Sequence, residues 1–151
     1  MRQLPLAVLF ALTLIALPAR GTALDEKTPD QQSIDALEAK ALAAQPREQC
    51  YLYAQLVHEM TEFSIMQYAA GDGDKATALM KRIQLFAQKI HASVGEDNKK
   101  LKDSEILLRH TAFRLSGILH NSTSEDRPLV EKTLAMVNQA QAEALLQVFR
   151  K

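Results

Sequence analysis

The chain has 151 residues, a length typical of a single domain. Apolar residues make up 47% of it and charged residues 24%, which excludes an intrinsically disordered chain. The 18 basic and 18 acidic residues cancel, so the composition lacks the excess positive charge with which proteins bind nucleic acid. We therefore expect no nucleic-acid partner.

The N-terminal residues have the three parts of a secretory signal peptide. Arg2 supplies a positive charge, an apolar run extends over residues 4–17, and Pro18 ends that run. Gly21 and Ala23 then place small residues where a signal peptidase requires them. This run is shorter than a membrane-spanning helix, which needs about 20 apolar residues. The alternative to a signal peptide is a membrane-anchoring first helix or a buried core helix. We predict cleavage after Ala23.

Cleavage there divides the chain into a signal peptide, residues 1–23, and a single helical bundle domain, residues 24–151. The predicted location is outside the cytoplasm, either in the bacterial periplasm or secreted from the cell. The mature chain would keep no stable membrane anchor, because the apolar run is removed and no cysteine directly follows it for lipid attachment.

The rest of the chain carries apolar residues at three- and four-residue spacing and lacks the alternating pattern of a strand. Proline, glycine and polar breaks divide it into five predicted helices. Thr28 and Gln31 fit a capping box at the start of the first helix, which we expect to end at about Ala44. The others are expected at residues 46–69, between Asp72 and Gly95, after the turn at residues 96–98 as far as about His120, and after Ser124 with Pro128 in the first turn.

Each of the last four predicted helices has one apolar side, which it can bury only against the others. The third has the clearest stripe: Ala76, Leu79, Met80, Ile83, Phe86, Ala87, Ile90 and Val94. The stripe of the fifth includes Val130, Leu134, Val137, Ala144, Leu145 and Val148. Short connections make successive helices antiparallel. We therefore predict an all-α fold, an antiparallel up-and-down four-helix bundle with a short extra N-terminal helix.

Tyr68, Gly71-Asp72 and Ala76 resemble the turn inside a tetratricopeptide repeat. In that family a Tyr near the end of one helix precedes Gly-Asp, and a small Ala begins the packing of the second helix. No second copy follows at the period of about 34 residues that the family shows. The resemblance therefore predicts a tight helical hairpin and not membership of the family.

His58 and Glu62 are the candidate metal ligands, because positions four apart share one face of a helix. A zinc-protease helix needs His at both positions, and a di-iron bundle needs two Glu-x-x-His pairs; the chain has neither. Both residues also lie opposite the apolar stripe of their helix, which predicts that they face solvent as a weak ion pair. We expect no metal site. His91 and His110 are expected to be partly buried and hydrogen-bonded.

Covalent haem attachment needs Cys-x-x-Cys-His, and the chain has a single cysteine, Cys50. The sequence also contains no Gly-x-Ser-x-Gly and no phosphate-binding glycine loop. We therefore expect no cofactor, no catalytic residue and no enzymatic activity. In an oxidising compartment Cys50 has two open roles: a buried thiol that acts as a small apolar side chain, or an intermolecular disulfide that makes a dimer.

These features favour an exported, non-enzymatic binding or structural protein of the bacterial envelope, which acts through protein–protein contacts with an unknown partner or as a homodimer. Ile106 and Phe113 form a second apolar strip on the fourth predicted helix, and Leu146 and Phe149 form one on the fifth. These strips either pack against the short first helix or belong to an interface. The alternative function is a metal- or cofactor-binding periplasmic bundle that uses the candidate ligand pair above.

Overall fold

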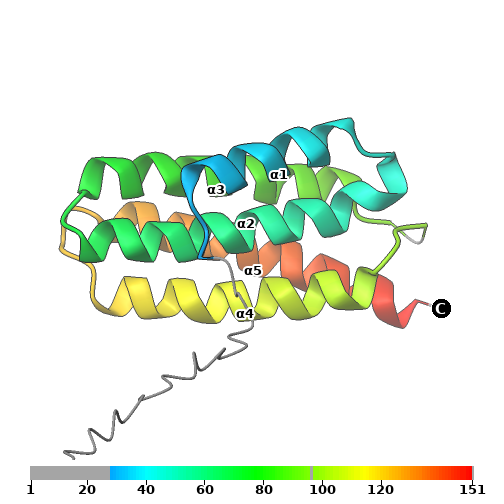
Figure 1. The fold of residues 1–151 in the computed structure, drawn as a ribbon. Helices are drawn as coiled ribbons and strands as arrows, with labels where there is room; N and C mark the ends of the chain where they lie inside the picture. The colour runs from blue at the N-terminus through cyan, green and yellow to red at the C-terminus, as the bar shows by residue number, and fades with distance from the viewer. Residues whose placement is uncertain (1–27, 96, 151) are drawn as a thin grey trace, which may run out of the picture.

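The computed structural model describes residues 28–95 and 97–150, which form five helices packed side by side (Figure 1). The helices are α1 (Gln31–Ala43), α2 (Pro46–Ala69), α3 (Gly73–Ser93), α4 (Leu101–His120) and α5 (Arg127–Phe149). The predicted fold class, an all-α four-helix bundle with a short extra helix at its N-terminal end, is confirmed. The predicted cleavage after Ala23 lies outside the described residues.

The four long helices have a defined order around the bundle: α2, α3, α5 and α4 occupy successive corners. Both α2 and α5 pack against α3 and α4, so the connection from α3 to α4 crosses the bundle diagonally. Successive helices run antiparallel, as their short connections predict. Because of the diagonal crossing, however, the spatial neighbours α2 and α4 run parallel, and so do α3 and α5 (Figure 1).

Side-chain hydrogen bonds confirm this parallel arrangement. Between α2 and α4, His58 bonds to Thr111 and Glu62 to Arg114, at sequence separations of 53 and 52 residues. Between α3 and α5 the corresponding separations are 49 and 52. A nearly constant separation is possible only when two helices advance in the same direction. The α2–α3 hairpin therefore stacks on the α4–α5 hairpin in the same orientation.

The start of α1 differs from the prediction. Asp30 is the cap: its carboxylate accepts a hydrogen bond from the Ser33 backbone N–H at 2.7 Å, and its own N–H donates to the Ser33 hydroxyl at 3.0 Å. The predicted capping box of Thr28 and Gln31 is therefore wrong by two residues. A short anionic side chain is a better cap than Thr because it also interacts favourably with the positive end of the helix dipole.

The short helix α1 packs along α2 and buries Ile34 and Ala41 there. Arg82 of α3 pairs with Glu38 and, at 3.5 Å, with Asp35, which ties α1 to the α2–α3 hairpin. Within the described residues α1 makes no packing contact with α4 or α5. Figure 1 shows α1 along the top of the bundle and α4 along the bottom. The extra helix thus packs on α2, is tied to α3 by Arg82, and leaves the α4–α5 hairpin uncovered.

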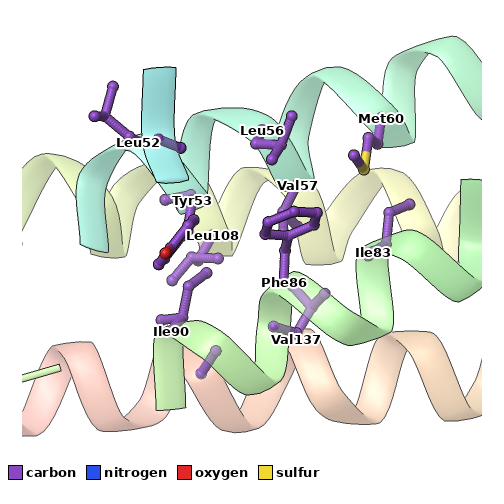
Figure 2. Packing of buried hydrophobic residues seen from close by; sticks show 14 of the residues in the cluster. Leu52, Tyr53, Leu56, Val57, Met60, Ile83, Phe86, Ile90, Leu108 and Val137 are labelled. Atoms are coloured by element: carbon purple, nitrogen blue, oxygen red, sulfur yellow. The ribbon is translucent and has the colours of Figure 1, made fainter. Parts of the chain in front are cut away.

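The apolar stripes meet in one core between the four long helices (Figure 2). The predicted stripe of α3 is confirmed from Ala76 to Ile90, with Phe86 close to Tyr53 of α2 at a ring-centroid distance of 5.6 Å. The stripe of α5 is partly wrong: Thr133 and Ala140 are buried, whereas Leu145 is 37% exposed. The two buried residues lie on the side that packs against α3, which the sequence did not identify as a neighbour.

Several hydroxyl side chains are buried in this core, and each finds a hydrogen-bond acceptor within its own helix. Each donates to the backbone carbonyl four residues earlier: Thr61, Ser64, Ser104, Thr111 and Thr133. This internal bond removes the penalty for burying a polar group and lets small side chains fill narrow parts of the core.

Among the described helices, none combines the length and the apolar character needed to cross a lipid bilayer.

The turn between α2 and α3 depends on Gly71, whose φ of 79° lies in the left-handed region. A Cβ at this position costs about 1–2 kcal/mol, so Gly71→Ala should lower the free energy of unfolding by roughly that amount. Gly73→Ala is the matched control, because Gly73 has no positive φ and no atom within 4 Å of the added Cβ. Urea unfolding of both variants would measure the difference, and equal stability would contradict this account of the turn.

Candidate functional site

The seam between α2 and α4 holds the main cluster of polar side chains on the long helices. His58 Nδ1 lies 3.0 Å from the Thr111 hydroxyl oxygen. The His58 ring also stacks on His110, with centroids 5.2 Å apart and planes inclined by 28°. The parallel register of the two helices places these three residues at the same level. Their proximity could not be read from the sequence, because it follows from the diagonal connection between α3 and α4.

The hydrogen bonds define which nitrogen of His58 carries the proton. The Thr111 hydroxyl has one proton and donates it to the Leu107 carbonyl at 2.8 Å. Nδ1 of His58 is therefore the donor to Thr111, and Nε2 is the unprotonated nitrogen of the neutral ring. This bond fixes the ring orientation on α2.

One turn further along the seam, Glu62 is bound by Arg114. The guanidinium donates to both carboxylate oxygens, at 2.7 and 3.0 Å. These hydrogen bonds lower the pKa of Glu62 against the opposing effect of its burial, and the charges of Arg114 and the two histidines act in the same direction. Both side chains are partly exposed, so the pair stabilises the α2–α4 contact modestly despite its two-pronged geometry.

Burial of the imidazole lowers the pKa of His58, which favours the neutral ring. The charge of Glu62 opposes this shift, whereas electrostatic interactions with His110 and Arg114 add to it. The His58–Thr111 pair and the Glu62–Arg114 pair therefore influence each other. Protonation of His58 would add a positive charge to a partly buried seam that already contains the Arg114 guanidinium.

The prediction that His58 and Glu62 face solvent is wrong. Both lie in the seam with α4, because α2 packs against three helices and so buries a wider part of its surface than its main apolar stripe. His110 is more exposed than predicted, and so is His91, which bonds to Glu143 of α5 at 2.6 Å.

A cavity of about 680 Å³ opens along this seam, lined by residues that include His58, Glu62, His110 and Arg114. In the described ranges 28–95 and 97–150, no three His, Cys, Asp or Glu side chains are placed so that they could hold a metal ion. Glu62, one of the two candidate ligands, has both carboxylate oxygens occupied by Arg114. The seam is thus organised by its own internal hydrogen bonds.

Cys50 of α2 lies in the core of the bundle and has no exposed surface. Its burial raises the pKa of the thiol to about 11, although a hydrogen bond with Ser104 opposes the shift. A neutral, enclosed thiol is a poor partner for disulfide formation. This placement favours the buried-thiol role over the intermolecular disulfide.

The apolar strips on α4 and α5 are exposed. Phe113 is 73% exposed and Phe149 is 78% exposed, the highest values among the large apolar side chains of the described residues. Ile106, Leu145 and Leu146 are exposed as well. We call these five residues the α4–α5 strip. Because α1 packs on α2, the strip is not covered by the first helix.

Comparison with protein-family models, with curated proteins and with solved structures finds no match to this chain.

The position of His58 predicts that acid destabilises the protein. Because the folded state lowers the pKa of this group below its ordinary value of 6.5, the unfolded chain binds the proton more readily, and stability falls as the pH drops through this range. Urea unfolding at about pH 7.5 and 5.5 should show the loss, and His58→Gln should reduce it. His120→Gln, at the exposed end of α4, is the control and should retain it. If the His58→Gln variant lost as much stability on acidification as the parent, the assignment would be wrong.

Proposed function

We propose that the protein is an exported, non-enzymatic binding protein of the bacterial envelope that acts through protein–protein contacts. The observation that carries this proposal is the exposure of the α4–α5 strip, with Phe113 and Phe149 each more than two-thirds exposed. Exposed aromatic side chains are favoured at interfaces because each removes a large apolar area from water when a partner binds.

The arrangement of α1 supports this interpretation. A strip that packed against the first helix would have an ordinary role in folding, and α1 does serve that role for α2, where Ile34 and Ala41 are buried. The strip on α4 and α5 has no such cover among the described residues. Large apolar side chains that stay exposed on one hairpin of a folded domain are candidates for an interaction site.

Contact through the strip can be tested by photo-crosslinking in the cell envelope. A photoreactive phenylalanine analogue in place of Phe113 should give an adduct larger than the monomer, because the partner lies against this side chain. The same analogue in place of Gln88, an exposed residue of α3, is the matched control and should give none. The readout is the adduct on a denaturing gel and the identity of its components by mass spectrometry. Absence of an adduct at Phe113 would contradict the proposal.

Export can be tested separately. When the full chain is expressed in a bacterium, N-terminal sequencing of protein from the periplasmic fraction should begin at Leu24. Ala23→Arg should cause the precursor to accumulate, because signal peptidase requires a small residue there, whereas Thr22→Gln should still be processed. A cytosolic protein that retains Met1 would refute export. The interaction surface would then still be tested by the crosslinking experiment.

A further inference from the structure

The outer face of the α4–α5 hairpin is long and narrow. Exposed positions at helical spacing make up this face: Lys102, Ile106, Arg109 and Phe113 of α4, with Leu145 and Phe149 of α5. Gln141 donates a hydrogen bond to Glu105 at 2.8 Å, which fixes the antiparallel register of the two helices. Phe113 and Phe149 each lie eight residues beyond this bond, so they stand at opposite ends of the face, about 24 Å apart along the helix axes. That length matches one side of an α-helix of about 16 residues.

Two basic side chains stand on this face between its aromatic ends. Lys102 is exposed and makes no ion pair within the described residues. Arg109 bonds to Glu105 at 3.3 Å, but the side chain of Arg109 is 65% exposed and that of Glu105 only 6%. The neighbouring Asp103 lies on the side of α4 toward Tyr51 of α2. Because the Glu105 carboxylate is buried beneath the guanidinium, a partner meets positive charge in the middle of the face.

The opposite side of the bundle shows how a short helix of this chain binds to a hairpin (Figure 1). There α1 packs on α2 and buries Ile34 and Ala41. Two acidic side chains of α1, one turn apart, pair with Arg82 of α3: Asp35 at 3.5 Å, and Glu38. An amphipathic helix with acidic residues beside its apolar side therefore already fits a hairpin surface that presents an arginine.

We propose that the outer face of the α4–α5 hairpin binds an amphipathic helix of a partner protein, with acidic residues beside its apolar side. The inference rests on the proposed function and names the chemistry of the partner. Apolar side chains of the partner helix cover Ile106, Phe113 and Phe149, and its carboxylates pair with Lys102 and Arg109. A bound helix makes contacts at three- and four-residue spacing, which is also the spacing of the exposed positions on α4.

The charges determine which helices the face accepts. Burial of the aromatic side chains supplies the affinity, whereas the basic side chains discriminate between partners. A helix with basic residues opposite Lys102 and Arg109 would meet like charges, which disfavours it. Glu131 stands beyond Phe113 at one end of the face, so a basic residue is favourable only at the corresponding end of the partner helix.

Two synthetic peptides test the charge requirement directly. Each has about 18 residues, enough to span the face, and the same apolar positions occupied by leucine. One peptide carries glutamate on both sides of the leucines, and the other carries lysine there. Fluorescence anisotropy with the purified protein should show that the acidic peptide binds about tenfold more tightly than the basic one, or better.

Surface variants connect this preference to the face. Lys102→Glu breaks no ion pair of the described residues and should by itself reduce the preference about threefold or more. Combined with Arg109→Glu, it should reverse the preference. Phe113→Ser should weaken both peptides alike, because it removes apolar area and no charge. Lys81→Glu, at an exposed position of α3, is the matched control and should leave the preference unchanged. Circular dichroism establishes that each variant keeps its helices.

The outcomes separate this inference from the function on which it rests. Equal affinities for the two peptides, or no binding of the acidic peptide at protein concentrations up to about 100 µM, would overturn it. Vesicles of phosphatidylglycerol test a membrane as the occupant. Cosedimentation of the protein with them, without binding of the acidic peptide, would also overturn the inference. Crosslinking at Phe113 judges the proposed function independently, since an adduct without any charge preference would keep the contact surface and reject the acidic helix.

Discussion

The packing of α2 against its three neighbours is the constraint on which the rest of the structure depends. This helix contacts α1, α3 and α4, and it contributes the largest set of buried side chains. Its contact with α4 is parallel, which requires the chain to cross the bundle between α3 and α4. The backbone N–H of Lys99 donates to the Arg47 carbonyl at 2.8 Å, so the connection is attached to the start of α2 before α4 begins. The order of the helices thus follows from how α2 is covered.

The α2–α4 seam is polar on its outer side and apolar toward the core. Glu62 and Arg114 neutralise each other, and the bond between His58 and Thr111 satisfies a partly buried ring nitrogen. Satisfied polar groups of this kind add modest net stability, but leaving one of them unpaired is costly. The seam therefore specifies the register of two parallel helices more than it strengthens their contact, while the apolar core supplies most of the favourable free energy.

The two sides of the bundle differ in whether another helix packs on their outer surface. On the α2–α3 hairpin, α1 buries its own apolar residues and is held by Arg82. On the α4–α5 hairpin the corresponding surface keeps Phe113 and Phe149 in contact with water. The described structure thus places α1 on one side of the bundle and leaves aromatic side chains exposed on the other. The position of the short N-terminal helix therefore leaves the α4–α5 strip available for the proposed binding function.

Local features of the sequence determined the helices and their ends. Apolar spacing defined the four long helices, capping and proline signals defined the first, and Gly71 with Asp72 marked the turn between α2 and α3, because these signals act within a few residues of one another. The tertiary structure alone decided which helices are neighbours, since four similar apolar stripes can be assembled in more than one order. For that reason the sequence placed His58 and Glu62 in solvent and could not associate them with Thr111, His110 and Arg114. It identified the strips at Phe113 and Phe149, but whether α1 covers them depends on a contact between distant segments, which only the folded chain establishes.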